Sequence, residues 1–184
     1  AFRLIGYSFG GTVAVEIASQ LRARGREVST LVLLDAPHPD VAAAGAAHAD
    51  LTDLLVSLFA GLRVDAADLR RRPEDEQIDI VMDAAKSASL APRAMTRDES
   101  HRYVHVCRAN QQRTHSPARY DGPVVLIRAA AGSNRITDDP RLGWSEAVLP
   151  DLRLRWVSSD HETMLAGEGV AAIVVALKDC CYPW

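Results

Sequence analysis

Residues 1–34 read AFRLIGYSFGGTVAVEIASQLRARGREVSTLVLL, and this stretch decides the fold. Its first part, Ala1–Tyr7, is a short apolar run, which is typical of a buried strand. Between Gly10 and Arg24 the apolar residues recur every fourth position, which predicts a helix with one buried face, and Gly25 suits the end of that helix. Residues Val28–Leu34 form a second apolar, β-branched run. Strand, helix and strand in this order predict a parallel sheet covered by helices.

The character of the chain changes after this unit. Residues 36–49 are rich in Pro, Ala and Gly. Beyond them the pattern predicts three helices (51–62, one starting near Pro73, and 97–113), then strands at 124–128 and 152–157 and a closing helix at 169–178. We therefore expect one α/β domain over residues 1–184, with a core formed by residues 1–37 and 121–184. The helical insertion at about 38–120 far exceeds the usual connection of about 2–6 residues, and insertions of this size are typical of lids.

Composition narrows the class of protein. The 184 residues include 24 acidic and 21 basic side chains, giving a net charge of −3 at pH 7. This balance argues against a nucleic-acid-binding protein and against a basic membrane-surface module. The apolar runs are far shorter than the roughly 18 residues that a transmembrane helix needs. Three cysteines, Cys107, Cys180 and Cys181, are an odd number and do not form a disulfide framework, so we expect a reducing compartment, the cytoplasm.

A motif for nucleophilic catalysis lies between the first predicted strand and helix. Residues Gly6-Tyr7-Ser8-Phe9-Gly10 match G-x-S-x-G, the nucleophile elbow, in which a sharp strand-to-helix turn exposes a strained serine. The flanking glycines let neighbouring backbone approach that turn. The helix N-terminus favours negative charge on a substrate oxygen, and the backbone N–H of Phe9 is the expected oxyanion donor. A turn without chemistry is the less favoured alternative.

A serine hydroxyl needs a base, and that base needs an acid to orient it. In α/β-hydrolases these groups follow the serine in the order acid, then histidine. Asp35 directly follows the second predicted strand, at the carboxyl end where catalytic groups gather in parallel sheets. Its competitors are Asp138 and Asp139, after the 124–128 strand, although these resemble turn residues before Pro140.

His161 is the predicted base, because it follows the last predicted strand and comes late in the chain. The other five histidines, His38, His48, His101, His105 and His115, lie in the Ala/Pro segment or in or beside the third inserted helix. His101 and His105 are four residues apart and could share a metal, but without a further ligand motif an exposed helix face is favoured.

The sequence contains no phosphate-binding loop, dinucleotide fingerprint, C-x-x-C pair or EF-hand loop, so we expect neither a bound cofactor nor a metal. A cluster of arginines at 70–72 is most simply exposed to solvent, with guidance of an acidic partner as the alternative.

Six segments together resemble the thioesterase domains of nonribosomal peptide and polyketide synthases. They are GYSFGG (6–11), LVLLDAP (31–37), PEDEQIDIVMDAAKSASLAP (73–92), ANQQRTHSPARYDGPVVLIRA (109–129), GWSEAV (143–148) and DHETML (160–165). The resemblance implies an α/β-hydrolase fold, a mostly parallel sheet flanked by helices, with a helical lid. It also implies that Ser8 is the acylated nucleophile, His161 the general base and Asp35 its orienting acid.

The implied reaction takes a peptidyl or polyketide chain from the phosphopantetheine thioester of a carrier protein onto Ser8. Water then hydrolyses the acyl-serine, or a nucleophile of the same chain closes a ring. Three alternatives stay open: a stand-alone editing thioesterase, a capped carboxylesterase or lipase, and a hydrolase-like domain without catalysis.

One feature departs from the family. Only seven residues precede Ser8, whereas members of this family carry several strands before the elbow and a loop there supplies a second oxyanion donor. We therefore expect those strands to be absent from this chain and the second donor to lie upstream of it.

Overall fold

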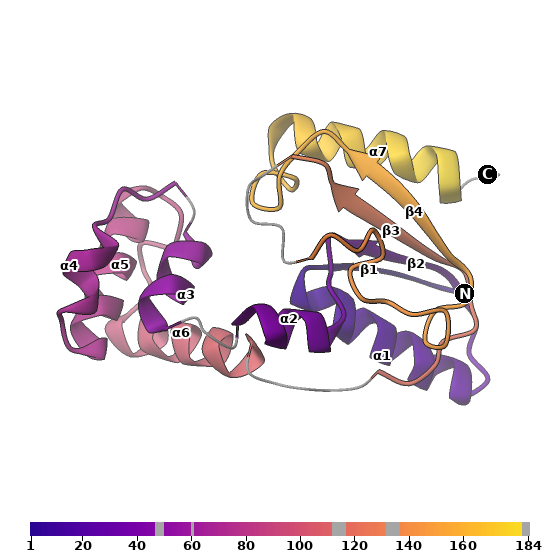
Figure 1. The fold of residues 1–184 in the computed structure, drawn as a ribbon, viewed down its shortest axis with the longest axis horizontal. Helices are drawn as coiled ribbons and strands as arrows, with labels where there is room; N and C mark the ends of the chain where they lie inside the picture. The colour runs from indigo at the N-terminus through magenta and orange to yellow at the C-terminus, as the bar shows by residue number, and fades with distance from the viewer. Residues whose placement is uncertain (47–49, 60, 112–116, 132–136, 182–184) are drawn as a thin grey trace. The chain divides into compact units, whose positions relative to one another are not determined.

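The sheet has four parallel strands in the order β1-β2-β3-β4, which confirms the predicted α/β class (Figure 1). They are β1 (Phe2–Tyr7), β2 (Val28–Leu34), β3 (Val124–Ala129) and β4 (Leu152–Val157). The structure is a computed structural model and describes residues 1–46, 50–59, 61–111, 117–131 and 137–181.

Helices cover the sheet on both faces (Figure 1). Along β2, Leu31 and Leu33 pack with residues of α1 (Phe9–Ala23), whereas the alternate residues Val32 and Leu34 pack with residues of α7 (Gly167–Cys181). The same alternation runs along β3. Because successive side chains of a strand point to opposite faces, a strand that is apolar throughout requires cover on both sides.

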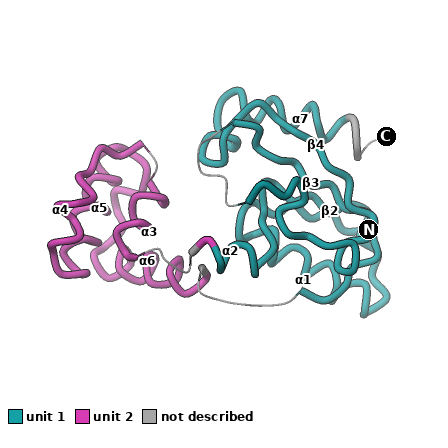
Figure 2. Tube along the Cα trace, viewed as in Figure 1, with its two compact units in different colours: residues 1–44, 114–184 teal, residues 45–113 magenta. Residues whose placement is uncertain are grey.

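The chain divides into two compact units (Figure 2). Residues 1–44 and 114–184 form the first, which contains the sheet, and residues 45–113 form the second. The second unit contains α3 (Leu51–Leu58), α4 (Ala66–Arg70), α5 (Glu74–Ser87) and α6 (Arg97–Gln111). It has a hydrophobic core of its own, made of Leu51, Leu54, Leu55, Phe59, Leu69, Ile78, Val81, Met82, Ala85 and Val104.

One predicted helix is shorter than expected, and two helices were not predicted. The helix expected over 51–62 ends at Leu58, because Phe59 leaves the helical conformation at φ −127° and Gly61 has φ +102°. Two helices were not predicted: α2 (Pro39–Ala46), whose first turn holds Asp40, and α4, which the Asp65 carboxylate caps through the N–H groups of Ala67 and Asp68. The predicted end of the third inserted helix, Arg113, lies outside the described residues.

The turn at residues 139–144, which precedes β4, packs against the backbone that follows β2. Trp144 is only 1% exposed, and its indole N–H donates to the carbonyl of Ala36 at 2.8 Å. The carboxylate of Asp139 closes this turn by accepting the N–H groups of Arg141 and Gly143. This arrangement supports the backbone that follows Asp35.

Within the described ranges, none of the helices combines the length and apolar character that a membrane crossing requires.

Candidate active site

Ser8 occupies the turn between β1 and α1 in a strained conformation, with φ 51° and ψ −127°. Positive φ is uncommon outside glycine, and it is held here by a hydrogen bond from the Ser8 N–H to the Leu34 carbonyl at 3.0 Å. A Cβ on Gly6 would lie 2.2 Å from the Gly10 carbonyl oxygen, so only glycine fits at that position. Gly10 itself is not crowded by the described residues; the second close approach is at Gly11, where a Cβ would lie 2.2 Å from Cβ of Ala36.

Asp35 lies directly after β2, also with a positive φ of 42°. Its backbone N–H donates to the carbonyl of Ile127, and its carboxylate oxygen Oδ1 accepts the N–H of Ala129 at 3.2 Å. The side chain is 13% exposed. The neighbouring strand β3 therefore fixes both the backbone and the carboxylate.

His161 lies between the other two side chains. Its Nδ1 is 2.9 Å from Asp35 Oδ2, and its Nε2 is 3.2 Å from Ser8 Oγ. With the proton on Nδ1, the ring donates to the carboxylate and Nε2 accepts the serine hydroxyl proton, which is the arrangement that activates a nucleophile. The structure thus brings together the three side chains that the sequence analysis selected from separate strand ends.

Phe9, the predicted oxyanion donor, is the first residue of α1. Its N–H has no intrahelical acceptor because of this position, and it lies where the helix dipole favours negative charge.

Tyr7 is a residue of this site that sequence reasoning missed. Its ring stacks on the His161 imidazole with 4.8 Å between centroids, and its hydroxyl donates to the His161 carbonyl at 2.7 Å. Burial, and then the nearby carboxylates of Glu162, Asp35 and Asp160, raise the pKa of Tyr7 to about 12, so the hydroxyl remains a donor at neutral pH. The motif letters give no signal of this contact, because residues 7 and 161 meet only when β1 and β4 join one sheet.

The loop that carries His161 is held by residues that precede and follow it in the chain. The Asp160 carboxylate accepts the Thr163 N–H at 2.7 Å, and hydrogen bonds from Thr163 lower the pKa of Asp160. Met164 is completely buried in the core beneath α7. The ordered loop keeps the imidazole at a defined position.

Asp139, a competing acid, is committed to its own turn. Backbone hydrogen bonds from Arg141 and Gly143 lower its pKa, and the partner of the His161 ring is Asp35 rather than Asp138 or Asp139.

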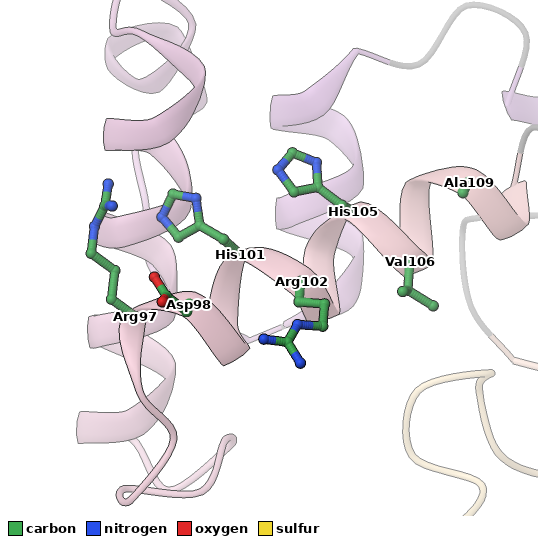
Figure 3. Close-up of a pocket in the computed structure, with 7 residues that line it drawn as sticks. All are labelled: Arg97, Asp98, His101, Arg102, His105, Val106 and Ala109. Atoms are coloured by element: carbon green, nitrogen blue, oxygen red, sulfur yellow. The ribbon is translucent and has the colours of Figure 1, made fainter.

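The other histidines lie elsewhere. His38 packs edge-on against Trp144, and burial lowers its pKa. His101 and His105 project from the same side of α6 and line a pocket of the helical unit (Figure 3). Nε2 of His101 is 2.8 Å from Oδ1 of Asp79. His48 and His115 fall outside the described residues. Across the part of the chain that the structure describes, three or more possible metal ligands do not cluster.

The arginines at 70–72 form ion pairs within the helical unit. Arg70 pairs with Asp50 and Asp53, and Arg71 and Arg72 both pair with Asp68. These contacts account for the cluster without an acidic partner.

Comparison with known proteins identifies the family of this chain. A family model described as the thioesterase domain matches residues 1–181. The chain belongs to the thioesterase domain family. It is 25% identical over 176 residues to the probable nonribosomal peptide synthetase CymA of Salinispora arenicola, covering 94% of this chain and 2% of that one. It is also 25% identical over 195 residues to chondramide synthase of Chondromyces crocatus, covering 96% of this chain and 5% of that protein.

Solved structures of a nonribosomal peptide synthetase and of a thioesterase domain share the fold. A four-domain nonribosomal peptide synthetase bound to AMP and glycine matches with a TM-score of 0.76 and 25% identity, over 98% of this chain and 14% of that one. The NocB thioesterase domain, in covalent complex with a fluorophosphonate nocardicin G analog, matches with a TM-score of 0.62 and 29% identity. The match covers 97% of this chain and 66% of that one. The chain therefore has the α/β-hydrolase type of fold of these thioesterase domains, and it spans only a small part of the curated relatives' length.

Proposed function

We propose that this thioesterase domain releases a peptidyl or polyketide chain from the phosphopantetheine thioester of a carrier protein through an acyl-Ser8 intermediate. The observation that carries the proposal is the continuous contact from Asp35 through His161 to Ser8 in a member of the thioesterase family. The carrier-bound substrate is supported by the relatives, which are nonribosomal peptide synthetases. The phosphopantetheine belongs to the substrate, and the domain needs no cofactor of its own.

In the first half-reaction, Ser8 Oγ attacks the thioester carbonyl while His161 Nε2 takes the hydroxyl proton. The Phe9 N–H stabilises the resulting oxyanion at the start of α1. When the intermediate collapses, the carbon–sulfur bond breaks and the leaving thiol takes the proton from His161. Asp35 stabilises the imidazolium throughout this step.

In the second half-reaction, a nucleophile attacks the acyl-Ser8 ester and transfers its proton to His161. If the nucleophile is water, the product is a free acid; if it is a hydroxyl or amine of the same chain, the product is a macrocycle. In both cases Ser8 Oγ recovers the proton from His161, which returns the site to its initial state.

We assign the lid role to the helical unit of residues 45–113. Its support is topological: the insertion leaves the sheet just after Asp35 and returns before β3, and it has its own core. A lid excludes water and gives an internal nucleophile time to react. Replacing the unit by a short linker should shift products towards free acid, measured by chromatography; an unchanged product ratio would contradict the role.

The test is intact-mass measurement after incubation with a peptidyl N-acetylcysteamine thioester, which mimics the end of phosphopantetheine. The wild-type protein should gain the mass of the acyl group, and Ser8→Ala should not. Ser87→Ala is the matched control, because Ser87 is an exposed serine on α5 whose hydroxyl donates to the helix backbone carbonyl of Asp83. Acylation of Ser8→Ala, or its full turnover, would overturn the proposal.

The same assay separates the other enzyme classes. Faster reaction with an acyl-carrier protein than with the small thioester supports carrier dependence, whereas equal reaction with oxygen esters indicates a carboxylesterase. Release of only short free acids indicates an editing thioesterase. Cyclic product from the acyl-enzyme assigns macrocyclisation.

A further inference from the structure

Arg128 is a buried arginine beside the catalytic carboxylate. It is the fifth residue of β3 and only 6% exposed, although the rest of that strand is apolar. Its Nε lies 3.8 Å from Oδ1 of Asp35. Arginine is rarely buried without a partner, because removing its charge from water is costly. The position of this guanidinium therefore requires an explanation.

Two further contacts hold the guanidinium at this position. One terminal nitrogen donates to the Asp139 carbonyl at 2.8 Å, and the Cζ atom lies over the Trp156 ring, 4.9 Å from its centroid. Trp156 is the neighbour of Arg128 in the β3–β4 register. The turn at Asp139 and the strand β4 thus both restrict a side chain that is flexible in solution.

The carboxylate of Asp35 uses its two oxygens for different partners. Oδ2 faces His161 Nδ1 at 2.9 Å, whereas Oδ1 accepts the Ala129 N–H at 3.2 Å and faces Arg128. Rotation of the carboxylate by part of a turn about its Cβ–Cγ bond would move Oδ2 away from His161 and Oδ1 away from Ala129. The guanidinium is protonated at all relevant pH values, so its attraction for Oδ1 opposes that rotation permanently.

We propose that Arg128 is a positioning residue for the acyl transfer, holding the Asp35 carboxylate so that Oδ2 faces His161. This inference rests on the proposed function, because it assigns Arg128 to the same proton relay. Arg128 acts through Asp35 and contacts neither Ser8 nor the substrate. Its loss should therefore lower the rate of the chemical step and leave binding nearly unchanged.

The experiment measures covalent labelling of Ser8 by a fluorophosphonate, followed by intact mass to give kinact and KI. Arg128→Met should lower kinact about 10- to 100-fold with KI within about twofold, a loss of the size found for residues that orient metal-binding side chains. Arg128→Lys restores the charge and should recover most of the loss. Arg153→Met is the matched control, because Arg153 is an exposed arginine on β4 that pairs with Asp151; it should label like the wild type.

A double-mutant cycle with Asp35→Asn separates positioning from a general effect on folding. If Arg128 acts through the carboxylate, adding Arg128→Met to Asp35→Asn should lower kinact by less than about threefold. An equal loss in both backgrounds, or no loss in the Asp35 background, overturns the proposal. If circular dichroism shows that Arg128→Met does not fold, Arg128→Gln is used in the same cycle, since it retains a donor for the Asp139 carbonyl without the charge.

Failure of this inference is distinguishable from failure of the proposed function. Labelling by a fluorophosphonate requires the proton relay but no thioester. If the protein is labelled at Ser8 but does not cleave thioesters, the proposed function is wrong. The labelling rates of the Arg128 variants still test the role of Arg128.

Discussion

Replacing Asp35 by Asn tests the proton relay most directly. In the proposed acylation His161 carries a positive charge in the transition state, and Asp35 Oδ2 lies 2.9 Å from its Nδ1. Asn removes the negative charge while keeping nearly the same shape. It also offers a donor where Nδ1 needs an acceptor, which favours the wrong tautomer of the imidazole.

The size of the effect follows from the distance and the burial. At 2.9 Å, Coulomb's law with an effective dielectric constant of about 20 gives roughly 6 kcal/mol. Because the His161 side chain is 34% exposed, solvent screening reduces this to roughly 4 kcal/mol. At about 1.4 kcal/mol for each factor of ten, the acylation rate should fall about 1000-fold.

The assay is stopped-flow or quenched acylation of Ser8 by the N-acetylcysteamine thioester, with kcat and KM determined separately. The loss should lie in kcat, because Asp35 stabilises the charge that His161 acquires when it takes the Ser8 proton, after the substrate has bound. Asp151→Asn, an exposed aspartate paired with Arg153, serves as the control. A kcat within tenfold of the wild type, or a loss confined to KM, would refute the reasoning.

Three further outcomes are expected. Gly6→Ala should destabilise the fold by about 1–3 kcal/mol in urea denaturation, because its Cβ meets the Gly10 carbonyl; unchanged stability would show that the elbow can relax. Tyr7→Phe keeps the stacked ring but loses the hydroxyl bond to His161, so kcat should fall a few-fold. Since the pKa of Tyr7 is raised from 10.0 to about 12, its contribution to stability is complete below pH 10 and is lost as the pH rises to about 12. In Tyr7→Phe the free energy of unfolding should therefore fall less steeply between pH 10 and pH 12. The same pH dependence in both proteins would contradict the assignment. Trp144→Phe removes the indole donor to the Ala36 carbonyl and should lower the free energy of unfolding by about 1–3 kcal/mol in thermal unfolding, with a lower kcat. A loss of stability without any change in kcat would show that this turn does not position the catalytic residues.

The elements of the sheet were predictable because their signals are local. Apolar runs at 28–34 and 124–128 indicate strands covered on both faces, and the structure has these strands within one residue. The end of α3 was not predictable from periodicity, since Leu62 continues the apolar pattern while the backbone turns at Phe59 and Gly61. Helix α2 was missed for the opposite reason: a Pro- and Ala-rich segment carries little periodic signal.

The sequence by itself determined which residues are candidates for catalysis. The elbow motif selected Ser8, and the ends of predicted strands selected Asp35 and His161, because parallel strands gather such residues at one edge. Only the tertiary structure shows that Asp35, rather than Asp138 or Asp139, is the carboxylate beside the His161 ring, since that contact depends on distances across the sheet. The contacts of Tyr7 with His161 and of Arg128 with Asp35 also join residues far apart in the chain. Strand order and register create these contacts, and a linear pattern carries no information about register between distant strands.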